Sequence, residues 1–175
     1  MEDSPIVLAT EIAEWSDFFV AMAGAAAALA GLLFVALSIT IKEIVAERSL
    51  PLRALQTVAL LVAALLTSGA ALMPGLSERT LGTVVFVVTG GIWVFIAVLQ
   101  IRQPRHYLGR DGKEHGEAFV WRVVITQTAT LPGVVGAVVL LGGSANGIYF
   151  LAAGILLSFA VAVINAWVLL VEILR

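Results

Sequence analysis

Two histidines and one glycine-containing turn are the residues that come closest to a chemical motif. His106 and His115 are too few for a metal site, and neither belongs to the His-Glu-x-x-His spacing of a zinc protease. Gly109-x-x-Gly112-Lys113 resembles a phosphate-binding loop, but the spacing is short and Glu114 stands where Ser or Thr is needed. We interpret this stretch as a turn and expect no metal and no cofactor.

A catalytic nucleophile is equally hard to find. The chain has no cysteine, which excludes thiol catalysis, thiolate metal sites and disulfides. Ser68 lies between Thr67 and Gly69 in an apolar stretch, but no histidine lies at the same depth to act as its base. We therefore predict no catalytic, cofactor-binding or metal-binding residues, and a protein that is not an enzyme.

Composition places the chain in a membrane. Hydrophobic residues make up 61% of its 175 residues and charged residues 13%, and the mean hydropathy is +1.05. Soluble domains contain about 45–50% apolar residues, and one core cannot bury so large an excess. This composition excludes a soluble enzyme, a disordered regulator and a nucleic-acid-binding protein with a basic face.

Five apolar stretches predict the fold. Each is about 20–24 residues long, which suffices to cross a hydrocarbon core about 30 Å thick. Only helices satisfy their backbone groups there without closing a barrel, so we predict an all-α polytopic membrane protein with one bundle over 18–175. The predicted spans are 18–41, 54–74, 81–100, 119–141 and 148–171. Residues 1–17 are expected to be an extracytoplasmic segment, with a short helix on the membrane surface over 4–15.

The basic residues predict one orientation. Nine of the ten lysines and arginines lie in or beside 42–53, 101–118 and the C-terminus, and Arg79 lies at the opposite end. Because basic residues favour the cytoplasmic side, five spans place the N-terminus outside and the C-terminus in the cytoplasm. The basic residues of 101–118 also suit anionic lipid headgroups or a cytoplasmic partner, and these interpretations stay open.

Polar stripes on the last two spans should face the bundle, because polar groups turned to lipid are left unsatisfied. The residues of these stripes are Arg122, Thr126, Thr130, Ser158, Asn165 and Glu172. Arg122 and Glu172 fall at the same depth of the hairpin, so we predict an ion pair between them; separate contact of each with headgroups is the alternative. Gln127 and Asn165 fit helix–helix hydrogen bonds and a pore lining equally well.

The first span carries a face of small residues. Steps of four and three place on one side of the helix Gly24, Ala28, Gly31, Val35 and Ser38. Small residues allow the close backbone approach on which helix packing in lipid depends. We predict that this face contacts another helix, of the same chain or of a second molecule. The opposite side, expected to meet lipid or looser neighbours, holds Met22, Leu29, Leu33 and Leu37.

Both ends of the chain resemble one group of proteins. The resemblance lies in residues 15–19 (WSDFF), 24–29 (GAAAAL), 31–39 (GLLFVALSI), 50–54 (LPLRA) and 165–173 (NAWVLLVEI). These segments are similar to small bacterial integral membrane proteins of uncharacterised function, some of which are labelled "modulator of FtsH protease". The resemblance implies a multi-pass protein of the bacterial inner membrane that binds and restrains a membrane-bound ATP-dependent protease. It brings no catalytic residues.

Two classes of function therefore stay open. The first is a non-enzymatic protein that binds and regulates or scaffolds a larger membrane complex, and the second is a small oligomeric channel or transporter. The predicted spans place no ionisable group near mid-membrane, which favours the first class because proton and ion pathways use such groups. The expected partners are the lipid bilayer and another membrane protein or a second copy of the chain, and no nucleic acid.

Overall fold

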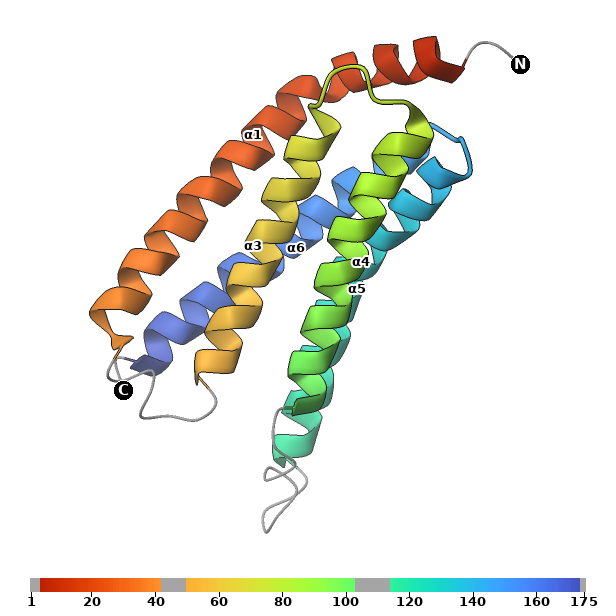
Figure 1. Ribbon diagram of the computed structural model, residues 1–175. Helices are drawn as coiled ribbons and strands as arrows, with labels where there is room; N and C mark the ends of the chain where they lie inside the picture. The colour runs from red at the N-terminus through yellow and green to blue at the C-terminus, as the bar shows by residue number, and fades with distance from the viewer. Residues whose placement is uncertain (1–3, 42–49, 103–113, 174–175) are drawn as a thin grey trace.

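A computed structural model describes residues 4–41, 50–102 and 114–173, with side chains for 14–41, 50–101 and 120–171. These residues form five long helices (Figure 1): α1 (Ser4–Ile39), α3 (Leu50–Ala71), α4 (Glu78–Arg102), α5 (Glu114–Leu141) and α6 (Gly147–Ile173). Each contains a stretch that is long and apolar enough to cross a membrane. The predicted all-α fold with five membrane-spanning helices is confirmed.

The four helices after α1 begin one to five residues before the predicted spans, and the first turns of α3 and α4 contain proline or polar residues. α3 includes Pro51, which the sequence assigns to the preceding loop. Proline fits a first helical turn, since its missing N–H has no partner to lose there. At the start of α4, the Ser77 hydroxyl accepts a hydrogen bond from the Thr80 N–H at 3.3 Å, which is the geometry of an N-cap.

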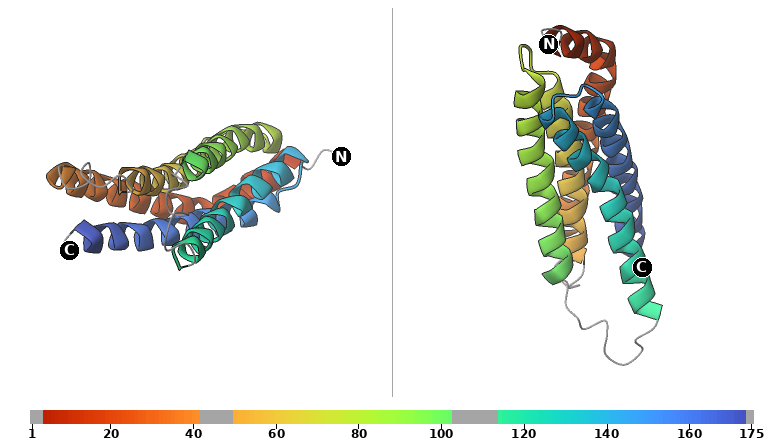
Figure 2. Two further views of the ribbon diagram at one scale, coloured as in Figure 1. Left: turned by 90° about the horizontal axis from the view of Figure 1, so that it is seen from below. Right: turned by 90° about the vertical axis from the view of Figure 1, so that its right-hand side faces the viewer.

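α1 is continuous from Ser4, so the segment over 4–15 is joined to the membrane span. Its first turns lie at an angle to the rest of the helix, across the end of the bundle that holds the α3–α4 and α5–α6 turns (Figures 1 and 2). Near this bend the Trp15 ring packs edge-on against Phe18 and against Tyr149 of α6, with ring centroids 5.6 and 5.2 Å apart. These aromatic contacts connect the start of the α1 span to α6.

α3 is the central helix of the bundle. It contacts α1, α4 and α6, and 61% of its span is buried, against 39% or less for each of the other four spans. α5 and α6 lie on one side of the bundle, and α3 and α4 lie on the other (Figure 2). Small side chains dominate the buried surface of α3, including Ala59, Ala63, Ala64, Ala70 and Ala71.

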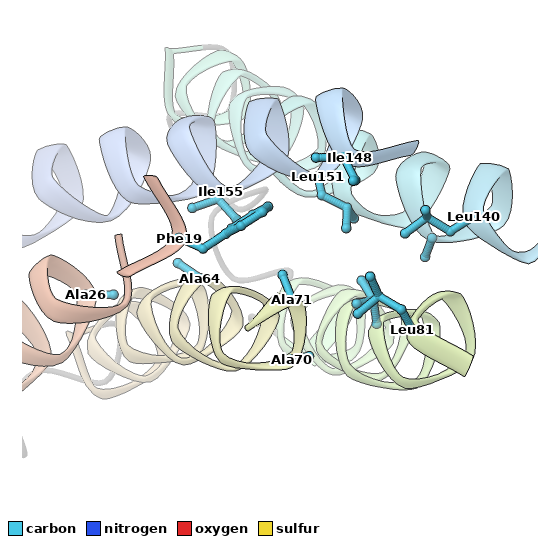
Figure 3. Packing of buried hydrophobic residues seen from close by; sticks show 12 residues of the cluster. Phe19, Ala26, Ala64, Ala70, Ala71, Leu81, Leu140, Ile148, Leu151 and Ile155 are labelled. Carbon is cyan, nitrogen blue, oxygen red and sulfur yellow. The ribbon is translucent and has the colours of Figure 1, made fainter. Parts of the chain in front are cut away.

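Large side chains of α1 pack against α3. Phe19 is fully buried, lies beside Ala64 and points towards Ile155 of α6 (Figure 3). Further along α1, Leu33 is buried in a second cluster with Leu60 and Leu61 of α3. In lipid this packing stabilises through dispersion contacts, since lipid tails already provide an apolar environment.

At their crossing points α5 and α6 lie too close together for any residue larger than glycine. A Cβ added to Gly154 would lie 2.6 Å from the backbone nitrogen of Gly133. One added to Gly147 would lie 2.6 Å from the Gly136 carbonyl oxygen. The two helices therefore contact each other through their backbones, and only glycine fits at these crossing points.

The arrangement of the helix ends leads to a topology prediction. Because the bend of α1 and both short turns share one end of the bundle (Figure 1), reporter fusions at these sites should agree. We expect an extracytoplasmic signal from fusions in 1–15, 75–80 and 142–147, and a cytoplasmic signal from 42–53, 101–118 and 175. A cytoplasmic signal from 75–80 would contradict the predicted orientation.

Candidate functional site

A small polar cavity lies between α3, α5 and α6, at the end of the bundle where α3 and α5 begin and α6 ends. We call it the arginine cavity. It has a volume of about 10 Å³ and is lined by Arg53, Gln56, Arg122, Asn165 and Val168. Two guanidinium-bearing side chains and two amide side chains from three helices thus face one space, in a part of the chain that is otherwise strongly apolar.

Buried hydrogen bonds hold the inner wall of the arginine cavity. Gln56 is 2% exposed, and its Nε2 donates to the Thr126 hydroxyl of α5 at 2.8 Å. Thr126 in turn donates to the backbone carbonyl of Arg122 at 2.9 Å. This chain of donors connects α3 to the turn of α5 that carries Arg122, and so sets the separation of the two helices at the cavity.

A second cavity, the hydroxyl cavity, lies deeper in the bundle between α3, α4, α5 and α6. Its volume is about 20 Å³ and its polar lining residues are Thr67, Thr89, Thr130 and Ser158. Three of these hydroxyls donate to backbone carbonyls. Thr89 donates to Val85 at 2.8 Å, Thr130 donates to Thr126 at 3.0 Å, and Ser158 donates to Ala129 at 3.2 Å. The space takes about one water molecule, and its described lining holds hydroxyls and apolar groups that do not titrate near neutral pH.

The hydroxyl of Ser158 contacts the turn of α5 that precedes Pro132. Pro132 lies inside that helix and lacks the N–H that would donate to the Thr128 carbonyl four residues earlier, which weakens this turn. Ser158 of α6 donates to the carbonyl of Ala129 in this turn at 3.2 Å. Neighbouring hydroxyls commonly satisfy backbone groups near proline in membrane helices. We therefore assign Ser158 a structural role.

A third polar group connects α4 to α5. Trp93 Nε1 donates to Gln127 Oε1 at 2.6 Å, and Gln127 Nε2 donates to Gln100 Oε1 at 3.0 Å. Of the two interpretations that the sequence leaves open for Gln127, this geometry matches helix–helix hydrogen bonding. Within the described part of the chain, the buried Gln100 Nε2 has no hydrogen-bond partner, and the same holds for the Ser68 hydroxyl.

The structure brings some of the predicted stripe residues together and leaves one unplaced. Thr126, Thr130 and Ser158 are buried inside the bundle. Arg122 and Asn165 are half-buried and both line the arginine cavity. The side chain of Glu172 lies outside the described residues, so its ion pair with Arg122 stays a prediction. His106 and the side chain of His115 also lie outside them.

The predicted packing face of α1 does not contact another helix within the part of the chain that the structure describes. Its five residues, Gly24, Ala28, Gly31, Val35 and Ser38, are all exposed, and a Cβ added to Gly24 or Gly31 would have no neighbour within 4 Å. The side expected to meet lipid or looser neighbours packs inwards instead, through the buried Leu33 and the partly buried Leu29 and Leu37. The interpretation of an intramolecular contact is therefore wrong. The physical reason is that the inward side of α1 carries Phe19, which lies beside Ala64 of α3 (Figure 3), and Leu33, which packs with Leu60 and Leu61. The opposite side of the helix, with Gly24 and Gly31, is therefore turned outwards.

Two residues of the arginine cavity were not recognised in the sequence as part of a site. Arg53 looks like a topogenic residue at a helix end, and Gln56 is one polar residue in an apolar run. Their spacing could have indicated a shared site, because positions 53 and 56 lie on one face of a helix, one turn apart.

The comparisons with known proteins identify no relative. No family model matches the chain, and neither a curated protein nor a solved structure matches it.

The hydrogen bonds of Gln127 give a stability prediction. Gln127→Leu removes both bonds and leaves the Trp93 indole N–H without its acceptor. Interhelical hydrogen bonds in membrane proteins contribute about 0.6–2 kcal/mol, so the free energy of unfolding in detergent should fall by that amount. Trp93 fluorescence should shift as well.

Thr128→Val is the matched control. Thr128 is exposed and its hydroxyl donates to the Val124 carbonyl of its own helix at 2.9 Å. Equal unfolding free energies of the two variants would show that the Trp93–Gln127–Gln100 group does not hold α4 to α5.

Proposed function

We propose that the protein is a non-enzymatic integral membrane protein of the bacterial inner membrane that binds and regulates or scaffolds a larger membrane complex. The observation that carries this proposal is the outward face of α1. On this helix the small residues point away from the bundle, and the glycines at 24 and 31 have open space beside them.

Such a face is suited to a transmembrane helix of another protein. Between helices in lipid, close backbone approach over small residues provides the contacts that large apolar side chains do not. A face turned permanently to lipid gains nothing from glycine, which also lowers helix stability by about 1 kcal/mol relative to alanine. Large apolar residues at its edges, Leu32 at 69% exposure and Ile39 at 76%, would pack around the central small residues.

The resemblance of both chain ends to proteins labelled as protease modulators supports one first candidate for the partner. That candidate is a membrane-bound ATP-dependent protease. Residues that carry this resemblance include the segment 24–39, which contains the outward face. We therefore propose that α1 is the helix that binds the partner.

A small oligomeric channel or transporter is the second candidate function. The hydroxyl cavity favours it, because hydroxyl groups from several helices meet in the middle of the bundle. A space of about 20 Å³ takes about one water, so conduction would require helix movement or a path between protomers.

Substitutions on the α1 face test the first proposal. The wild type and the variants Gly31→Leu and Gly91→Leu would be expressed in bacteria with an affinity tag, and the proteins retained from detergent-solubilised membranes would be identified by mass spectrometry. We expect the wild type to retain the protease, and Gly31→Leu to retain about tenfold less, because leucine prevents the close approach of the helices.

Gly91→Leu is the matched control, since Gly91 is an exposed glycine of α4 that also has nothing within 4 Å of an added Cβ. Equal retention of the protease by both variants would contradict a role for the α1 face. If the wild type retains no protease and the purified protein conducts ions in liposomes, the channel proposal replaces the first one.

A further inference from the structure

The arginine cavity brings two guanidinium groups of different helices to one end of the bundle. Arg53 is the fourth residue of the span Leu50–Ala71, and Arg122 is the third residue of the span Val120–Leu141. Both spans begin at the end where α6 finishes (Figure 1). At a helix rise of about 1.5 Å per residue, the two residues therefore lie about 3–5 Å from the first residue of their candidate spans.

At this depth the nearest abundant anion is the phosphate of a lipid headgroup. Arginine side chains close to a helix end reach towards that level, and basic pockets between transmembrane helices are typical sites for anionic headgroups. A guanidinium forms bidentate hydrogen bonds with phosphate oxygens. The amides of Gln56 and Asn165 add polar groups to the same lining, whose described residues include no aspartate or glutamate.

The size of the cavity fits part of such a group. About 10 Å³ is close to the room that one water or one phosphate oxygen needs. The other phosphate oxygens would lie at the mouth of the cavity, where headgroups are present.

A carboxylate in contact with either arginine would not remove the site. A guanidinium has five N–H donors, so a contact with a carboxylate, such as the predicted one between Arg122 and Glu172, leaves donors for a phosphate oxygen. A carboxylate in contact would lower the affinity, and its removal would raise it.

We infer that the arginine cavity binds the phosphate group of an anionic phospholipid, with Arg53 and Arg122 as its two guanidinium ligands. The site needs no partner protein, so it is independent of the function proposed above.

Native mass spectrometry of the purified, delipidated full chain tests this inference. The probes are phosphatidylglycerol and phosphatidylcholine, added in equal amounts to the detergent micelles. We expect the wild type to bind phosphatidylglycerol preferentially. Arg53→Gln and Arg122→Gln should each lower that binding about fivefold, the effect of one basic residue near a lipid surface, and Glu172→Gln should raise it.

Arg79→Gln is the control, because Arg79 is an exposed arginine at the opposite end of the bundle. Unchanged binding in both cavity variants, or an equal loss in Arg79→Gln, would overturn the inference. Arg53→Lys separates charge from geometry: it should lose part of the binding, since lysine keeps the charge and lacks the planar fork.

Two further measurements test whether the variants are folded and whether the bound phosphate belongs to a lipid. The thermal unfolding transition of each variant shows whether it is folded, and Arg53→Gln carries the test alone if Arg122→Gln does not fold. Excess inorganic phosphate is then added to the wild type. If phosphatidylglycerol stays bound, the cavity is a lipid site. If inorganic phosphate displaces it from the wild type but not from the two glutamine variants, the cavity binds a soluble phosphate and the lipid assignment is overturned.

Discussion

The backbone contact between α5 and α6 is the constraint on which the rest of the bundle depends. At Gly136, Gly147 and Gly154 the two helices approach so closely that an added Cβ would lie within 3 Å of the backbone of the neighbouring helix. Lipid provides little hydrophobic force to hold helices together. The contact area gained by close approach holds the helices together instead. It also fixes how α6 crosses α3, which is the most buried helix of the five described.

This crossing positions the polar groups of the bundle. Ser158 reaches the Ala129 carbonyl because the helices touch at Gly154, one turn away. The same crossing carries Asn165 to the end of the bundle where Arg53 and Arg122 lie. Both cavities are thus consequences of where the glycines fall along α5 and α6. α1, which lies on α3 with Phe19 and Leu33 inwards, is left with its small face exposed.

The number of spans, their approximate limits and the all-α fold could be predicted from the sequence, because the apolar length needed to cross a bilayer is a strong physical signal. The side of α1 that faces inwards could not. A stripe of small residues indicates a contact but not the partner, and the contact of α1 with α3 is made by Phe19 and Leu33 on the other side of the helix. The hydrogen-bond partners of the buried polar residues could not be predicted either. Nothing in the sequence pairs Gln56 with Thr126 or Trp93 with Gln127, because these pairs depend on how the helices cross. The arginine cavity depends on the same crossing.

The stability of two alanine variants tests the central role of the α5–α6 contact most directly. In Gly154→Ala the new Cβ would lie 2.6 Å from the Gly133 nitrogen, so the helices must separate, and the free energy of unfolding in detergent should fall by about 1–3 kcal/mol. Gly91→Ala, with nothing within 4 Å of its Cβ, should be unchanged or stabilised by up to about 1 kcal/mol through helix propensity. A Gly154→Ala protein as stable as Gly91→Ala would contradict the account, because the bundle would then not depend on close approach at this crossing.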